Sequence, residues 1–573
     1  MAGESWGKVA RRSTIPALDG LSGSRRVSPR EWVWVGIASL AVVALFSLPY
    51  LVGVASATPD MAFGGYLLGI DDVYSYIAKM RYGAYDGWLL QLVYTTEPHR
   101  GGFAYVFYLI LGKLTALISG QGARVHFETL TAAYHAARAG FGLLLLLAIY
   151  RFAAEFLDDP PQRRLAWAVA ALAGGLGWLT LARPGLAADM GGDSRPVEFY
   201  VPEAFSTLLL YGLPHLALAR TLLIAGWLAL FRSLDTSDRS RAFAAGLAWA
   251  GMAAVVPFYV ALLGVLIAAW LAVMLIAGRR IPWREIGLAA LAGGLPLLMV
   301  GYYGWLFTQN PVFASWGAGN ILVSPPPGRY VLAYSLLVGL AIPGAVTVIL
   351  RSGITNRAAL LLCWPPVTAV LVYLPVSVQR RLLEGIVLPL SVLATLGVWW
   401  LVGQKPDQGG QRLVWRLRQF AVAALVMLLF PSTVALLGGA VRSASVLQPP
   451  VFLSADERAA YEWLRAEAPL GSAVLSTYES GNRLPAFAGV RVYVGHGVET
   501  VDFHAKRARA GAFFCGGMED SSRQALLARA GIDYVWVGPS EQQAPCTPFQ
   551  PEALGLRPVF SQGSYTIYRV TEQ

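Results

Sequence analysis

The chain is poor in charge and in recognisable soluble-enzyme motifs. Charged residues fill 14% of its 573 positions and hydrophobic residues 56%, and the mean hydropathy is +0.52. A soluble protein could not bury this much apolar surface, so the composition is typical of a polytopic membrane protein. The sequence contains no internal repeat, glycine-rich phosphate loop, G-x-S-x-G elbow or H-E-x-x-H motif. These absences argue against nucleotide hydrolysis, serine hydrolase chemistry and zincin proteolysis.

Cysteine is also scarce, with three residues in the whole chain. Cys363 falls in a predicted spanning helix, where packing is its expected role. Cys515 and Cys546 fall in loops of the C-terminal region, and neither has histidine at a metal-ligand spacing, so zinc is not expected. An oxidising exterior would allow a disulfide between these two, and the sequence leaves the bridged and free forms open.

Positive charge exceeds negative charge, with 45 Lys and Arg against 34 Asp and Glu, a net charge of +11. The arginines concentrate in short loops between apolar segments, which is the pattern of cytoplasmic loops, so no nucleic-acid partner is expected. The N-terminal tail, residues 1–31, is polar and basic and should stay cytoplasmic. The other predicted cytoplasmic loops contain Arg163/Arg164, Arg232/Arg239/Arg241, Arg279/Arg280/Arg284, Arg351/Arg357 and Lys405/Arg412/Arg416/Arg418.

Apolar segments of roughly 17–25 residues, long enough to cross a bilayer, recur along the chain. The first, 32–55, exceeds the roughly 7–15 residues of a cleaved signal core, so it is interpreted as an uncleaved anchor. Further spans are predicted at 131–150, 165–182, 213–231, 242–256, 258–278, 285–306, 329–350, 358–376, 384–402 and 419–440. About eleven spans place the N-terminus in the cytoplasm and the C-terminus outside. The predicted transmembrane domain covers 32–445, with outer loops at 56–130, 183–212, 307–328 and 377–383.

One apolar segment, 103–118, is slightly short and has Lys113 in its middle. A crossing here would force Arg163 and Arg164 to the outside. We therefore predict an amphipathic helix that lies at the outer interface and packs on the bundle.

The sequence changes character near Ser454. Ser454 is expected to cap a helix over 455–468. Short β-type runs and polar helical stretches then alternate, with strands at 473–475, 490–494, 534–537, 558–561 and 565–570 and helices near 503–514 and 521–530. The alternation predicts a small extracytoplasmic α/β domain over residues 450–573, attached to a mainly α, polytopic membrane domain.

Two adjacent acids, Asp71 and Asp72, follow the first span. Asp71 begins a predicted helix that reaches Arg81, so a capping and dipole role is one interpretation. Capping explains one acid better than two, which favours a catalytic or ligand-binding role. The same loop has His99 and Arg100 among many aromatic residues, which either mark the headgroup belt or offer stacking surfaces for sugars.

A second outer loop carries Asp193, Glu198 and Glu203. Pro202 suits the first turn of a helix, which would place Glu203 near a positive helix end. Glu198 and Glu203 lie between apolar residues, so a solvated-loop role is less expected for them than for Asp193. A second acidic site on the outer face is what an acceptor-activating or metal-binding pocket would need.

Ionisable residues inside or beside spans are costly and usually functional. His135 and Arg138 share one face of a span, His215 and Arg220 lie in the outer half of another, and Arg380, Arg381 and Glu384 form a short outer turn. The planar fork of arginine suits phosphate. Snorkelling of these arginines to lipid headgroups is the alternative.

Together these features resemble the C-type glycosyltransferase superfamily (GT-C), polytopic enzymes that take sugars from polyprenyl-phosphate carriers at the non-cytoplasmic face. The resemblance rests on Asp71-Asp72 after the first span, on EPHRGGFAYVFYLILGKL, on HAARAGFGLLLLLAIYRFAAEFL, on the second acidic loop and on the soluble C-terminal domain. The segments QRRLLEGIVLPLSVLA and RVYVGHGVETVDFHAKRARAGAFF are similar to bacterial membrane proteins, which implies the bacterial inner (plasma) membrane.

The resemblance implies an inverting glycosyltransferase, which transfers the sugar by direct displacement at the anomeric carbon. The base would be Asp71 or Asp72, with Glu198 or Glu203 as the second acid, and arginines would hold the donor phosphate. His496, Glu499 and His504 are the best contact candidates of the C-terminal domain, and loop packing is the alternative role for them. The acceptor is a glycan, lipid or protein, and a divalent cation (Mg or Mn), if used, would bind Asp71, Asp72 and Glu198.

Two other classes remain open. A transporter or flippase of lipid-linked sugars would also place arginines and histidines at mid-depth, although it would more often show internal repeats. A non-catalytic membrane scaffold, which binds a partner through its outer domain, would tolerate replacement of the acids in both outer loops.

Overall fold

The computed structural model describes residues 26–191, 195–406, 409–542 and 550–571. Most of the basic N-terminal tail, Asp193 and Cys546 lie outside these ranges, so the choice between bridged and free forms of Cys515 and Cys546 stays open. The chain forms two compact units. Unit 1 comprises residues 1–43, 142–298 and 322–436, and unit 2 comprises 44–141, 299–321 and 437–573.

Within the described residues, eight helical segments are long and apolar enough to span a membrane, which confirms a polytopic helical protein. They are α2 (Pro29–Ser56), α5 (Phe127–Phe156), α10 (Pro214–Thr236), α12 (Tyr259–Gly278), α13 (Trp283–Gln309), α15 (Pro327–Ser352), η4 with α17 (Gln379–Leu383, Val387–Val402) and α18 with α19 (Gly409–Met427, Pro431–Ala444). Each matches a predicted span. The other three predicted spans are shorter helices: α6 (Pro160–Leu172), α11 (Arg239–Val255) and α16 (Asn356–Leu371).

The predicted span at 165–182 is wrong as a continuous helix. It breaks after α6 at Gly174-Gly175, and the short helix α7 (Trp178–Ala182) follows. Gly175 has φ +65°, and a Cβ there would lie 2.0 Å from the carbonyl oxygen of Ala333, so only glycine fits this turn. The break brings the following residues beside the second acidic loop.

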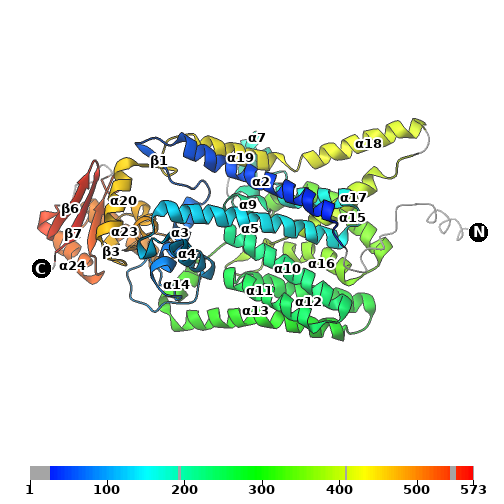
Figure 1. Cartoon of the computed structure of the whole chain (residues 1–573), viewed down its shortest axis with the longest axis horizontal. Helices are drawn as coiled ribbons and strands as arrows, with labels where there is room; N and C mark the ends of the chain where they lie inside the picture. Colours follow the sequence, from blue (N-terminus) through cyan, green and yellow to red (C-terminus); the bar gives the residue numbers. More distant parts are fainter. Residues whose placement is uncertain (1–25, 192–194, 407–408, 543–549, 572–573) are drawn as a thin grey trace, which may run out of the picture. The chain divides into compact units, whose positions relative to one another are not determined.

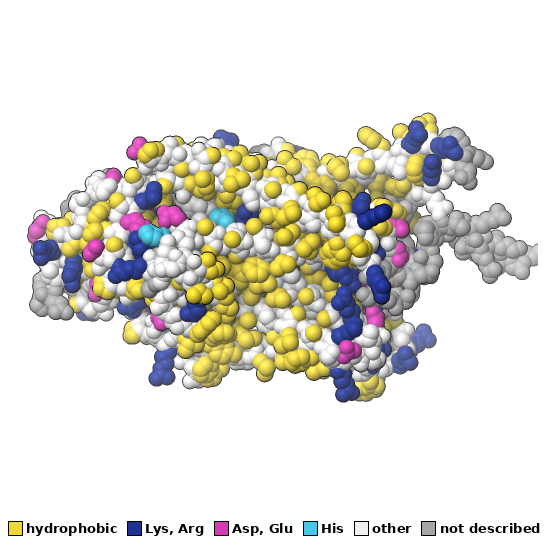
Figure 2. Space-filling model, viewed as in Figure 1, with side chains coloured by type: hydrophobic (Ala, Val, Ile, Leu, Met, Phe, Trp, Pro, Cys, Tyr) yellow, Lys and Arg dark blue, Asp and Glu magenta, His cyan; other side chains and the backbone are white. Residues whose placement is uncertain are grey.

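Within unit 1, α10 packs on α11, α15 on α17, and α12 on α16 (Figure 1). Glycines allow the closest approach, since a Cβ at Gly344 of α15 would lie 1.9 Å from the Leu393 carbonyl oxygen of α17. Figure 2 shows hydrophobic side chains along these helices and Lys and Arg side chains gathered at one end of them. The remaining short elements of unit 1 are α8 (Pro184–Asp189), η3 (Val197–Phe199) and α9 (Thr207–Gly212).

In unit 2, helix α3 (Ile70–Tyr85) crosses helix α4 (Val106–Ser119) at two glycines. A Cβ at Gly112 would lie 1.8 Å from the Met80 carbonyl oxygen, and one at Gly83 would lie 2.5 Å from that of Leu109. Helix α4 has 14 residues, fewer than a membrane span needs. Lys113 of this helix donates hydrogen bonds to the backbone carbonyls of Gly83 and Asp86. Unit 2 also contains η2 (Gly122–Arg124) and α14 (Pro311–Gly319).

The C-terminal region of unit 2 is the predicted α/β domain. Its mixed five-stranded sheet has the order β4-β3-β5-β7-β6, from strands β3 (Ala473–Leu475), β4 (Arg491–Val492), β5 (Tyr534–Val537), β6 (Leu556–Gln562) and β7 (Tyr565–Val570). Its helices are α20 (Ala455–Glu467), α21 (Tyr478–Gly481), α22 (Leu484–Ala488), α23 (Phe503–Phe514) and α24 (Asp520–Arg529), with η5 at Glu552–Leu554. Ser454 caps α20 as predicted, its Oγ accepting from the Glu457 amide.

Different helices pack on the two faces of this sheet. Val535 and Val537 pack with Phe513 and Leu527 of α23 and α24, whereas Trp536 stacks on Tyr461 of α20. A small antiparallel ladder pairs β1 (Met61–Phe63) with β2 (Phe452–Ser454) and so ties the first outer loop to the start of the domain. Helix α3 and the α/β domain therefore belong to one compact unit.

Candidate functional site

One face of α3 is polar and meets the α/β domain. Asp71, Ser75 and Lys79 follow one another at four-residue intervals, which places them on the same side of the helix, with Asp72 beside them. Gly69 occupies the N-cap position and no side chain caps the helix. The carboxylates of Asp71 and Asp72 are therefore not used as caps. We call these four residues, with Tyr478, Asn482, His496 and Glu499, the α3 cluster.

Asp71 is exposed and is oriented by two neutral donors. The Asn482 amide donates to its Oδ1 at 2.7 Å and the Tyr478 hydroxyl to its Oδ2 at 3.1 Å. Tyr478 lies on α21, under the guanidinium of Arg507, and Asn482 follows α21. The α/β domain thus fixes the direction of this carboxylate without an ion pair to it.

Asp72 is held differently, by a cation. His496 Nε2 lies 3.0 Å from Asp72 Oδ1, and His496 Nδ1 lies 3.3 Å from Glu499 Oε1. Burial alone would lower the pKa of His496, but its contacts with Asp72 and Glu499 outweigh burial and raise the pKa to about 9. At neutral pH, His496 is therefore an imidazolium between two carboxylates.

Glu499 joins His496 to the buried end of the cluster. Its Oε1 accepts from Lys79 Nζ at 2.6 Å and from Ser75 Oγ at 2.8 Å, and Lys79 also donates to Ser75. Burial opposes ionisation of Glu499, yet the charges of Lys79 and His496 lower its pKa to about 2. The ammonium of Lys79 also lies 4.1 Å from the centre of the Tyr105 ring.

Three buried polar atoms of the cluster make no hydrogen bond within the described ranges: Asn482 Oδ1, His496 Nδ1 and Glu499 Oε2. Buried polar atoms are normally satisfied by protein or by a bound molecule. Asn482 Oδ1 and Glu499 Oε2 can therefore accept further hydrogen bonds, and His496 Nδ1 can donate one, beside two exposed carboxylates.

The second acidic loop lies in unit 1, where Glu198 is 2% exposed. Ser432 Oγ donates to Glu198 Oε1 at 2.6 Å, while Oε2 makes no hydrogen bond to any described residue. Burial raises the pKa of Glu198 to about 7, despite the hydrogen bond from Ser432. A Cβ at Gly177 would lie 2.2 Å from Oε1, so the break after α6 makes room for this carboxyl group.

The expectation that Pro202 begins a helix is wrong, because Pro202 and Glu203 lie in a turn and α9 begins at Thr207. The cause is Arg220, whose guanidinium binds the carbonyl oxygens of Glu203 and Phe205 that a helix starting here would use. Glu203 is buried, and its Oε1 pairs with Arg381 Nη1 at 3.2 Å.

Arg220 and Glu384 form a fully buried ion pair. Arg220 donates from Nε and Nη2 to the two oxygens of Glu384, and its other N–H groups bind Ser206 Oγ and backbone carbonyls. All five N–H groups of Arg220 are thereby used. This arrangement fits a clamp between segments of the fold better than a ligand for donor phosphate.

Several of the other predicted site residues are engaged locally. His99 uses both ring nitrogens on backbone groups of its own loop, at 2.8 and 2.9 Å, and Arg100 is exposed. His135 contacts the Gly65 carbonyl at 2.9 Å and accepts from Arg138 at 3.3 Å. In unit 1, His215 is half-buried on α10, and the Arg380 side chain makes no ion pair with the described part of the chain.

A metal site was expected, if present, at Asp71, Asp72 and Glu198. The first two belong to unit 2 and Glu198 to unit 1. Carboxylate oxygens suit Mg²⁺ or Mn²⁺, but Asp72 already pairs with the His496 imidazolium and Lys79 adds a second positive charge. Among the described residues, His126, Glu128 and Glu462 have ligand atoms within 4.8 Å of one another, on the surface of unit 2.

Sequence reasoning missed Ser75, Lys79, Tyr478 and Asn482. The signal was available in part, since Ser75 and Lys79 continue the helical spacing from Asp71, and Tyr478 and Asn482 are also four residues apart. What the sequence could not give is the contact between two segments separated by about 400 positions.

Solved structures provide the comparison that decides the fold. An oligosaccharyltransferase of Archaeoglobus fulgidus, crystallised with a tethered acceptor peptide, matches 87% of this chain and 69% of its own at 12% identity and TM-score 0.50. Its apo form matches 88% of this chain and 69% of its own at 14% identity and TM-score 0.50. The chain has the GT-C fold.

ArnT of Cupriavidus metallidurans in the apo state is also similar, at 13% identity and TM-score 0.46, over 93% of this chain and 98% of that one. No protein-family model matches the sequence, and no curated protein matches it. The GT-C fold confirms the predicted combination of a polytopic helical domain and a C-terminal α/β domain.

Proposed function

We propose that this chain is a glycosyltransferase that moves a sugar from a polyprenyl-phosphate donor to an acceptor at the extracytoplasmic membrane face. The observation that carries the proposal is the α3 cluster, in which the α/β domain contacts the two first-loop acids differently. Asp71 accepts hydrogen bonds from neutral groups, and Asp72 pairs with the charged His496. The fold supports it, since the similar archaeal protein is an oligosaccharyltransferase with an acceptor peptide.

Asp71 is the better base of the two acids. A general base must be free to take a proton, and a cation bound to it lowers its proton affinity. Asp72 is paired with the imidazolium of His496, whereas the hydrogen bonds that Asp71 accepts from described residues come from neutral groups. Tyr478 and Asn482 orient Asp71, so its exposed oxygens can receive the proton of an acceptor hydroxyl.

The reaction would be a direct displacement at the anomeric carbon. The acceptor oxygen forms a bond to this carbon and passes its proton to Asp71. The bond to the donor phosphate breaks, and its electron pair leaves with the polyprenyl phosphate. We assign no step to a metal ion, because His496 and Lys79 already supply positive charge beside the acids.

A turnover assay tests the proposal. The purified protein, reconstituted in lipid, receives a polyprenyl-phosphate sugar with a labelled sugar and a candidate acceptor, and release of free polyprenyl phosphate is measured. Transfer by the wild type and its loss in Asp71→Asn are expected. Asp86→Asn is the matched control, because Asp86 is an exposed acid of the same loop whose Oδ1 accepts from the neighbouring Gly87 amide. Movement of intact donor across the bilayer without cleavage would support a flippase instead, and full transfer by Asp71→Asn would remove Asp71 as the base.

A further inference from the structure

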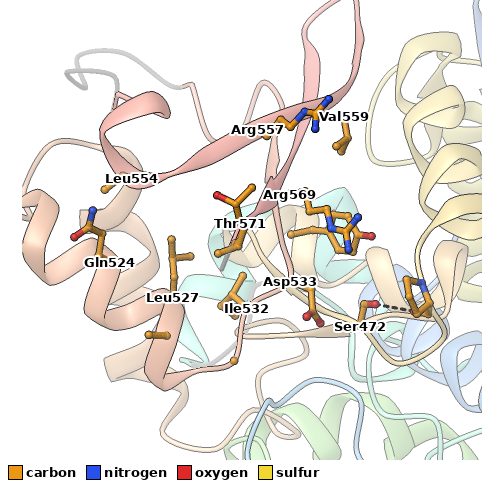
Figure 3. A pocket seen from close by; sticks show the side chains of 15 residues that line it. Ser472, Gln524, Leu527, Ile532, Asp533, Leu554, Arg557, Val559, Arg569 and Thr571 are labelled. Carbon is orange, nitrogen blue, oxygen red and sulfur yellow. Dashed lines mark hydrogen bonds between the residues drawn. The ribbon is translucent and has the colours of Figure 1, made fainter. Parts of the chain in front are cut away.

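The α/β domain has a groove of about 890 Å³ at one end of its sheet, and none of its lining residues belongs to the α3 cluster (Figure 3). The turn before β3, the start of β5 and the ends of β6 and β7 form one part of the lining. Helix α24 and the loop after it form the other. Sites of this size accommodate ligands such as one or two sugar units.

Two arginines lie side by side in this groove. In the register of the sheet, Tyr534 of β5 pairs with Arg569 of β7, and Arg569 pairs with Arg557 of β6. Directly paired residues of antiparallel strands point to the same face, so these three side chains form a row across the sheet. Both arginines are exposed and line the groove (Figure 3).

The structure shows no direct neutralising contact for this arginine pair within the described ranges. Neither guanidinium forms an ion pair or side-chain hydrogen bond with any residue of the described ranges. Like charges directly opposite each other destabilise a sheet. Asp533, the acid that lines the groove, has its Oδ2 occupied by the Ala473 amide. An oxyanion between the two guanidinium forks would remove the repulsion and accept paired hydrogen bonds.

The rest of the lining suits a sugar. Ser472, Gln524 and Thr571 line it with hydroxyl and amide groups, each of which donates to a backbone carbonyl and has an oxygen that can accept a further hydrogen bond. Tyr534, Leu527 and Leu554 also line it, but their side chains are buried in the domain. A simple ion-binding spot would need only the arginines, whereas this groove extends well beyond them.

We propose that this groove binds a saccharide that carries an oxyanion, either a phosphate ester or a carboxylate, with Arg557 and Arg569 on the anionic group. The site is separate from the α3 cluster. Its existence does not depend on the proposed transfer reaction, because the argument uses only the lining of the groove.

Direct binding to the full-length protein tests this inference. The protein is held in nanodiscs of uncharged lipid, and calorimetry measures binding of glucose 6-phosphate, glucuronate, glucose and inorganic phosphate. The two acidic sugars should bind, each more tightly than glucose or inorganic phosphate. The double variant Arg557→Gln/Arg569→Gln should weaken this binding by at least about tenfold. Arg529→Gln, an exposed arginine of α24 outside the groove, should leave binding unchanged.

Several outcomes would overturn the inference. Equal binding of acidic and neutral sugars, equal binding of inorganic phosphate and sugar phosphate, or no binding of either acidic sugar would each do so. Binding to vesicles that contain phosphatidylglycerol, without binding of acidic sugars, would identify a lipid headgroup instead. Arg557→Lys/Arg569→Lys keeps the charge, so it should retain partial binding and serves if the glutamine variant does not fold. If the glutamine pair folds and binds the acidic sugars as tightly as the wild type, the proposal is contradicted. If the lysine pair folds and loses all binding, a site that depends on charge is contradicted.

Discussion

Two groups of buried charge, one in each unit, differ in how completely they are hydrogen-bonded. In unit 1, Arg220 and Glu384 are fully buried, and every N–H group of the arginine has an acceptor. In unit 2, the α3 cluster combines buried charges with the exposed acids Asp71 and Asp72 and leaves three buried polar atoms without hydrogen bonds to described residues. A saturated pair can hold a fold together but has nothing left for a ligand. An open cluster can bind one.

The largest effect on stability is expected from Arg220→Met, which would leave the carboxylate of Glu384 buried without its partner. Removal of one member of a buried pair costs about 3–5 kcal/mol of unfolding free energy. Thermal unfolding in detergent should show a strongly lowered midpoint. Arg241→Ala, which breaks the exposed pair with Asp238, is the control, expected to cost about 0–1 kcal/mol. Equal unfolding midpoints for the two variants would contradict the larger contribution expected of the buried ion pair.

In the α3 cluster the largest effect should be on catalysis. Asp71→Asn removes the proposed base, so the rate of transfer should fall by about 10²–10⁴-fold, with little change in the unfolding midpoint. Asp72→Asn should cost less, because Asp72 acts through His496 in this scheme. A larger loss in Asp72→Asn than in Asp71→Asn would reverse the assignment.

His496 makes the stability of the cluster depend on pH. Because its folded pKa is raised to about 9 from the ordinary 6.5, its stabilising contribution is fully present below about pH 6.5 and is lost as pH rises through 9. The full contribution is at most roughly 3 kcal/mol. Unfolding midpoints of wild type and His496→Gln should therefore differ at pH 6 and converge near pH 10.

His126→Gln is the matched control for that measurement, because His126 is an exposed histidine of the same unit. Its difference from wild type should stay small across this range. If the difference in unfolding midpoint between wild type and His496→Gln grew as the pH rises, it would contradict the charged state assigned to His496.

A smaller effect of opposite sign is expected at Glu198. Burial raises its folded pKa to about 7 from the ordinary 4.5, so ionisation costs stability as pH rises between these values. Glu198→Gln mimics the neutral form. It should unfold at the same temperature as wild type near pH 5 and be more stable at pH 8, by roughly 1–2 kcal/mol. A variant less stable than wild type at pH 8 would show that the charged carboxylate is stabilised by a partner.

Local patterns predicted much of the fold. The strand at 565–570 and the helix at 503–514 appear with the predicted boundaries, because alternating and polar-helical patterns are read within one segment. The span at 165–182 failed because its hydropathy is continuous across Gly174-Gly175. The turn there is imposed by close contact with Ala333, which is distant in sequence.

The candidate site was predicted by composition but not by geometry. Asp71 and Asp72 were recognisable as an acid pair after a span, and His496 and Glu499 as polar residues of the outer domain. Their different partners were not. Arg220 and Glu384 looked like ligand residues because charges in spans are costly, yet a buried charge can be satisfied equally well by another side chain.

The sequence alone determined that this is a polytopic helical protein with a C-terminal α/β domain, because hydropathy and short-range periodicity depend on neighbouring residues. Only the tertiary structure decided which charges are satisfied and which remain open. Hydrogen bonding is a matter of distance and direction between atoms, and the atoms that meet Asp71 and Asp72 come from positions about 400 residues further along the chain.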